Sequence, residues 1–152
     1  MRYIEKIIQV LLFFYILIVV GLTFLQVVFR NIGVSISGYD EIIGIAAIWS
    51  YFLGMAHTTL TNSHIKGGLD ELIANAAIRQ FLGILSSIGL LLFSMIALTA
   101  SVGIFMTALS LNYRTLYFDI PVALSLFALV IGFGLNIVFI LMRAERKNNH
   151  FR

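Results

Sequence analysis

Four long apolar segments separated by short polar connections set the pattern of the 152-residue chain. A helix rises about 1.5 Å per residue, so about 20 apolar residues are needed to cross about 30 Å of hydrocarbon. The segments that meet this length lie at about 7–29, 42–61, 82–110 and 120–142. Backbone polar groups in lipid must be satisfied within the segment. The pattern therefore predicts an all-α integral membrane protein with four transmembrane helices, forming a single membrane domain over residues 1–152.

The third segment is part of an uncharged stretch, 80–113, that is longer than a bilayer requires. As one straight helix it would measure about 50 Å, so it must tilt, bend or protrude. Small residues near its beginning are candidate bend positions. They are Gly83, Ser86, Ser87 and Gly89.

Lysine and arginine are distributed unequally between the two ends of these segments. With four spans, one side holds eight basic residues, namely Arg2, Lys6, Lys66, Arg79, Arg143, Arg146, Lys147 and Arg152. The other side holds Arg30 and Arg114. Short cytoplasmic loops retain positive charge, so we expect both termini to lie in the cytoplasm.

The connection between the second and third segments has helical periodicity of its own. Leu69, Leu72, Ile73 and Ala76 recur at helical spacing after the Gly67-Gly68 pair. This spacing predicts a short amphipathic helix over about 69–79, lying in the membrane interface. An ordinary polar loop is the alternative.

Composition excludes several classes of function. Hydrophobic residues make up 61% of the chain and charged residues 11%, which is far from the composition of a soluble domain. The formal charge is +3, but the basic residues form no patch, so we expect no nucleic-acid partner. The chain has no cysteine, and its histidines lack the spacing of metal ligands. We therefore expect no metal, no cofactor and no catalytic residues.

The interiors of the four segments contain no Asp, Glu, Lys or Arg. Their polar residues are Ser, Thr and four larger side chains, Gln9, Gln26, His57 and Asn136. A histidine inside a membrane is a possible proton relay. His57 has no second histidine or carboxylate one turn away, so the favoured interpretation is a helix-packing residue.

Two acidic residues, Asp40 and Glu41, precede the second apolar segment. Carboxylates at this position stabilise a helix N-terminus, which is the favoured interpretation. The alternative is that Glu41 also pairs with Arg30.

Small residues recur at helical spacing in two of the segments. Ala46, Ser50 and Gly54 form one stripe, and Ala128 and Gly132 form a shorter one. Such stripes allow close approach of another helix.

Several residues, taken in order, carry a resemblance to a known family. They are Arg30, Asp40-Glu41, Trp49, Gly54, His64-Ile65, Asp70, Ile120-Pro121 and Ile131-Gly132. On the four-span frame this order resembles the small membrane subunit, the DctQ-type or Q subunit, of tripartite ATP-independent periplasmic (TRAP) transporters. Two features depart from the family pattern, the Gly67-Gly68 insertion and Val130 in place of a second proline.

The resemblance implies a non-catalytic subunit in the bacterial inner membrane that scaffolds a large multi-span M subunit. That subunit would carry the substrate and sodium sites, while a periplasmic binding protein delivers an organic acid such as a dicarboxylate or sialic acid. We expect the segments 31–40 and 111–119 to help receive the binding protein. The candidate docking or interface residues are Arg30, Asp40, Glu41, Trp49, Gly54, His64, Arg114 and Asp119.

Two other functions compete with this interpretation. A self-sufficient four-helix dimeric exporter needs a carboxylate within its first span, and 7–29 contains none. The other is an assembly subunit of a different membrane complex, which neighbouring genes for a permease and a binding protein would distinguish.

Overall fold

The computed structural model describes residues 2–34, 37–61 and 76–149. Within these ranges the chain forms four long helices and no strand. The helices are α1 (Arg2–Asn31), α2 (Tyr39–Thr61), α4 (Ala76–Ser110) and α5 (Ala123–Asn149). Each contains a stretch long and apolar enough to cross a membrane, which agrees with the prediction of four spans.

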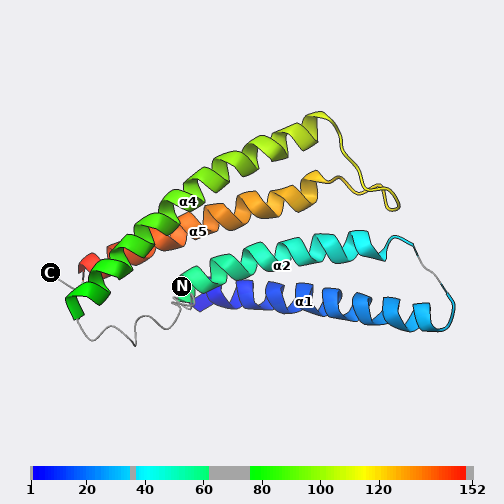
Figure 1. Cartoon of the computed structure of the whole chain (residues 1–152), viewed down its shortest axis with the longest axis horizontal. Coiled ribbons are helices and arrows are strands. Elements are labelled where there is room, and N and C mark those ends of the chain that lie inside the picture. Colours follow the sequence, from blue (N-terminus) through cyan, green and yellow to red (C-terminus); the bar gives the residue numbers. More distant parts are fainter. Residues whose placement is uncertain (1, 35–36, 62–75, 150–152) are drawn as a thin grey trace.

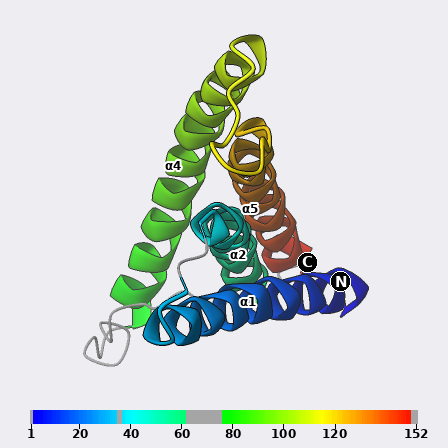
Figure 2. The same ribbon diagram turned by 90° about the vertical axis from the view of Figure 1, so that its right-hand side faces the viewer.

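The helices pack in the order α1, α2, α5, α4 (Figures 1 and 2). Because α2 and α5 occupy the middle, they are the more buried helices: 22% and 28% of the residues in their apolar stretches are buried, against 6% in α1 and in α4. The beginning of α1 and the end of α5 lie at the same end of the molecule (Figure 1). We call this the terminal end, and the other the loop end.

The helices do not end where their apolar segments end. α1 begins at Arg2 rather than near residue 7, and α2 begins at Tyr39 rather than near residue 42. The hydrocarbon limits the apolar segment, whereas the hydrogen-bonded helix can continue into the polar interface. α5 begins three residues later than expected, at Ala123, because the residues before it form an ordered connection described below.

α4 is a single helix of 35 residues. The small residues expected to allow a bend lie inside it, and the Ser87 hydroxyl donates to the Gly83 carbonyl at 2.8 Å. Of the predicted interfacial helix, residues 69–75 lie outside the described part of the chain. Residues 76–79 are the beginning of α4.

A small apolar core joins three helices near the terminal end. Ile8 of α1, Ala56 of α2 and Phe139 of α5 are buried against one another. Partly buried side chains surround them, namely Leu12, Leu60, Leu135 and Met142. This core fixes α1 against the central pair.

α5 and α2 approach each other closely at Gly132. A Cβ atom added at Gly132 would lie 2.6 Å from Cβ of Phe52, so only glycine fits there. In the other predicted stripe, a Cβ at Gly54 would meet Leu12 of α1 at an ordinary 3.9 Å. Both stripes contain a buried alanine, Ala46 and Ala128, and of the two glycines it is Gly132 whose packing leaves no room for a side chain.

Candidate partner-docking surface

The connection between α4 and α5 forms an ordered hairpin over residues 111–122. The Thr115 N–H donates to the Ile120 carbonyl and the Val122 N–H donates to the Tyr113 carbonyl, both at 2.9 Å. Asn112 and Asp119 adopt left-handed backbone conformations, with φ of 48° and 53°. Asn and Asp tolerate this region better than most residues, so the sequence suits the turn.

Arg114 and Asp119 are paired within this hairpin. The Arg114 guanidinium donates to the Asp119 carboxylate at 2.8 Å and to the Asp119 carbonyl at 3.2 Å. Both side chains remain exposed, Arg114 at 44% and Asp119 at 74%. The pair therefore fixes the hairpin while leaving charge accessible at the loop end.

Glu41 connects the beginning of α2 to the turn of the hairpin. Its carboxylate accepts the Tyr117 N–H at 2.8 Å and the Phe118 N–H at 3.0 Å. The Thr115 hydroxyl and the Leu116 N–H also face it. An ionised carboxylate is an acceptor only, so it suits a turn that presents successive N–H groups.

The prediction for the two acidic residues is thus right about their position and wrong about the alternative partner. Asp40 and Glu41 lie in the first turn of α2, where they oppose the helix dipole. Within the described residues Glu41 binds the hairpin and forms no ion pair with Arg30. The sequence could not reveal this contact, because its donors are backbone groups 76 and 77 residues away.

Asp40, next to Glu41 in the first turn of α2, joins α2 to α1. Its carboxylate accepts a hydrogen bond from the Gln26 amide at 2.9 Å. Gly38, just before α2, is buried with φ of 98°, and an added Cβ would lie 2.8 Å from the Phe118 ring. The connection from α1 to α2 and the hairpin therefore pack directly on each other.

The remaining candidate residues lie elsewhere. Trp49 stacks on Tyr15 of α1 at a centroid distance of 5.9 Å and meets Phe127 of α5 edge-on at 6.4 Å. It therefore packs three helices together, with Gly54 one turn further along α2. His64 lies outside the described residues.

Three helices are joined by a buried polar network that the sequence only hinted at. The Asn136 side-chain NH2 group of α5 donates to the Ser94 hydroxyl of α4 at 2.7 Å, and the Thr59 hydroxyl of α2 donates to the side-chain oxygen Oδ1 of Asn136. All three side chains are no more than 2% exposed. Asn136 was recognisable in the sequence as a large polar residue in an apolar segment. Its partners could not be distinguished from the other Ser and Thr residues of the segments.

His57 contacts α1 through Gln9, with 3.3 Å between the amide nitrogen and Nε2. When the amide donates, Nε2 is the acceptor and the neutral imidazole carries its proton on Nδ1. This contact between helices fits the packing interpretation.

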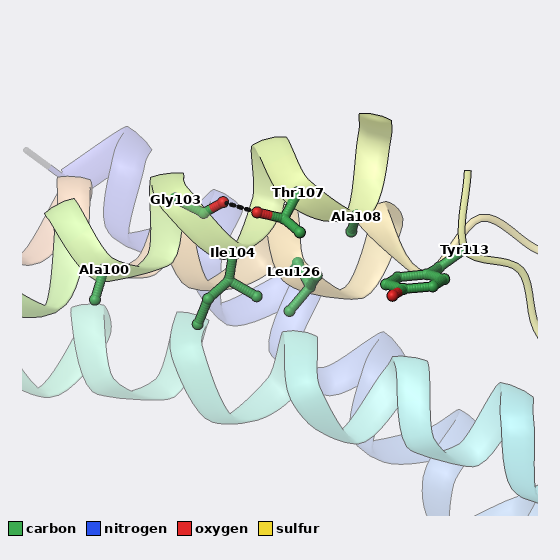
Figure 3. Close-up of a pocket in the computed structure, with 7 residues that line it drawn as sticks. All are labelled: Ala100, Gly103, Ile104, Thr107, Ala108, Tyr113 and Leu126. Carbon is green, nitrogen blue, oxygen red and sulfur yellow. Dashed lines mark hydrogen bonds between the residues drawn. The ribbon is translucent and has the colours of Figure 1, made fainter. Parts of the chain in front are cut away.

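A shallow groove of about 330 Å³ lies on the face shared by α4 and α5 (Figure 3). Small residues of α4 line it, together with Leu126 and Tyr113. The hydroxyl of Thr107, also on this face, donates to the Gly103 carbonyl of its own helix at 2.9 Å. That hydrogen is therefore not available to a ligand in the groove.

The structure thus brings four of the charged candidates to the loop end. Asp40, Glu41, Arg114 and Asp119 gather around the hairpin, and Arg30 closes α1 one turn beyond Gln26. Of these, Glu41 is partly buried, whereas Arg30, Asp40 and the Arg114–Asp119 pair are exposed.

Comparison with known proteins gives a match to a family model. The model describes the DctQ component of tripartite ATP-independent periplasmic transporters and matches residues 18–147. No curated protein and no solved structure matches the chain. The matched region contains the second part of α1, from residue 18, all of α2, α4 and the hairpin, and α5 up to residue 147. The chain belongs to the DctQ family and is a multi-pass inner-membrane component of a TRAP transporter.

Proposed function

We propose that this subunit is a non-catalytic scaffold for the large M subunit. The M subunit would carry out sodium-coupled uptake of an organic acid, of the dicarboxylate or sialic acid class, delivered by a periplasmic binding protein. The proposal rests mainly on the hydrogen bonds that the buried polar side chains form within the chain. Thr59, Ser94 and Asn136 bond to one another, and the Ser101 hydroxyl donates to the Ala97 carbonyl at 2.6 Å. The first three groups join helices and Ser101 bonds within α4, so all four are used in the fold, and substrate and ion sites would belong to the partner.

The surface offered to the M subunit would come from the outer helices. α1 and α4 each pack against one side of the central pair and expose most of their apolar residues. Phe13 and Phe24 on α1, and Phe93 and Ile96 on α4, are each more than half exposed. In a bilayer this surface meets lipid or another membrane protein, and helix packing between subunits uses such faces.

The loop end would face the periplasm. This orientation follows from the eight basic residues that the sequence places on the terminal side. Arg30, Asp40, Arg114 and Asp119 are then exposed charges available to a soluble binding protein. Charges at the rim of an interface mainly change the association rate and its dependence on salt.

Recovery of partners tests the scaffold role. The chain, tagged at its C-terminus, is purified in detergent from its native membrane, and the co-purifying proteins are identified by mass spectrometry. We expect a large multi-span permease in equal amount. A homodimer without such a partner would contradict the proposal and favour the dimeric exporter.

Charge reversal tests docking separately. R30E and R114E should slow binding of the loaded binding protein and reduce uptake, whereas K6E at the terminal end is the matched control. The exchange R114D/D119R keeps an ion pair in the hairpin while moving its charges, so it separates docking from hairpin stability. Uptake and docking that are unchanged in all these variants would exclude the docking role.

A further inference from the structure

The turn of the α4–α5 hairpin exposes large apolar side chains. Leu116 is 87% exposed, Tyr117 60% and Phe118 48%. We call these three residues the hairpin tip. Exposed apolar clusters of this kind mark surfaces that contact something other than water.

The hairpin tip is held in a fixed position. Glu41 binds two of its N–H groups, and the Phe118 ring lies against Gly38. The backbone hydrogen bonds across the hairpin, described above, fix the conformation of the residues on either side of the tip. The tip therefore presents its side chains in one orientation.

The contacts of Glu41 also determine how far the tip extends. It lies beside the first turn of α2, where Asp40 accepts a hydrogen bond from Gln26 of α1 (Figures 1 and 2). Gln26 precedes Arg30 by one helical turn, which is about 6 Å along the helix. The tip is thus level with the last apolar turn of α1, where Val27 is 54% exposed, and does not project beyond the charged end of that helix.

From this level and composition we propose that the hairpin tip inserts into the boundary between headgroups and acyl chains, in the phospholipid leaflet at the loop end. Leu116 and Phe118 match the acyl side of the boundary. Tyr117 combines an apolar ring with a hydroxyl, which is why tyrosine is enriched at this depth. Arg114, next along the hairpin, can keep its guanidinium on the headgroup side.

A soluble partner fits the observations less well. Surfaces for transient partners face water between encounters and are about as polar as the rest of a protein surface. The hairpin tip presents Leu116 almost completely, and its backbone N–H groups at positions 117 and 118 already bind Glu41. In the lipid interface these apolar side chains would be removed from water continuously, and not only while a partner is bound.

Site-directed fluorescence quenching in phospholipid nanodiscs tests the proposal. The chain has no cysteine, so L116C gives a single labelling site on the full-length protein. The nanodiscs contain phosphatidylethanolamine and phosphatidylglycerol, with lipids carrying a nitroxide either just below the headgroup or deep in the acyl chain. Iodide serves as the aqueous quencher. N31C, beyond Arg30, is the aqueous control, and I96C, 70% exposed near the middle of the apolar span of α4, is the deep control.

We expect the L116C label to lose its fluorescence to the shallow nitroxide and to keep it in iodide. N31C should respond to iodide and I96C to the deep nitroxide, which also verifies that the labelled proteins are folded. If L116C responds to iodide as N31C does, the hairpin tip faces water and the proposal is wrong. Loss of shallow quenching when the large subunit is reconstituted with the chain would show that a protein covers the tip, and would also overturn it.

Discussion

Glu41 and Tyr117, 76 residues apart in the sequence, are joined by a 2.8 Å hydrogen bond between a side-chain carboxylate and a backbone N–H. The same carboxylate accepts the Phe118 N–H. The contact links the beginning of α2 to the hairpin between α4 and α5. It complements the Asn136 network, which links α2, α5 and α4 within the span.

Removing the carboxylate should release the hairpin turn. In E41A we expect faster hydrogen–deuterium exchange at the Tyr117 and Phe118 amides, because their acceptor is lost. E41Q should be intermediate, since its amide oxygen accepts a hydrogen bond but its NH2 group cannot. D40A is the matched control, because it removes the bond to Gln26 and leaves the hairpin acceptor in place. Equal exchange in E41A and D40A would contradict the assigned role of Glu41.

Gly38 and Gly33 offer a paired test of packing against the hairpin. Both have positive φ, 98° and 77°, so alanine is strained at either position. A Cβ at position 38 would also collide with the Phe118 ring, whereas one at position 33 meets nothing within 4 Å. We therefore expect G38A, more than G33A, to lower the melting temperature and to increase exchange at the hairpin amides. Indistinguishable variants would mean that the ring moves aside freely.

The Asn136 network should contribute measurably to stability. N136L should destabilise the protein by about 0.6–2 kcal/mol, since hydrogen bonds between membrane helices contribute about 0.6 kcal/mol on average in double-mutant cycles and about 1–2 kcal/mol in model peptides. In a double-mutant cycle, N136L and S94A should be coupled, because the two side chains share a hydrogen bond. S101A is the control, since this buried hydroxyl bonds only to its own helix. Unfolding in mixed micelles measures the free energies, and additive effects of N136L and S94A would refute the coupling.

Of two neighbouring glycines on α5, Gly132 and Gly134, we expect substitution by alanine to lower stability more at Gly132. G132A places a Cβ 2.6 Å from Cβ of Phe52, and overpacking of this kind typically costs about 1–3 kcal/mol. G134A meets nothing within 4 Å and should leave stability unchanged, or raise it by up to about 1 kcal/mol through helix propensity. Thermal unfolding monitored by circular dichroism compares them. A stable G132A would show that α2 and α5 separate at little cost.

The sequence predicts the spans well because a single strong requirement governs them. Apolar length alone identifies the four helices, and the acidic pair marks where α2 begins. The ends differ because helix and hydrocarbon need not stop together, as the start of α1 at Arg2 shows.

The contacts of the candidate site could not be predicted from the sequence, because they do not depend on distinctive residue types. Glu41 binds N–H groups that every residue except proline has, so no pattern near positions 117 and 118 announces the contact. Ser94 and Thr59 likewise resemble the other hydroxyl residues of the spans, whose side chains bond to their own helix. Only the packing of α4 and α2 on α5 brings them to Asn136.

The packing order α1, α2, α5, α4 leaves a molecule with two edges. A closed four-helix bundle has no vacancy for a further helix unless one of its own is displaced. An open row can be extended at either edge, by lipid or by a neighbour, while its central contacts stay as they are. A partner that packed at either edge would therefore add to the row without rearranging it, and the hydrogen bonds of Asn136 and Glu41 would continue to join α2, α5, α4 and the hairpin.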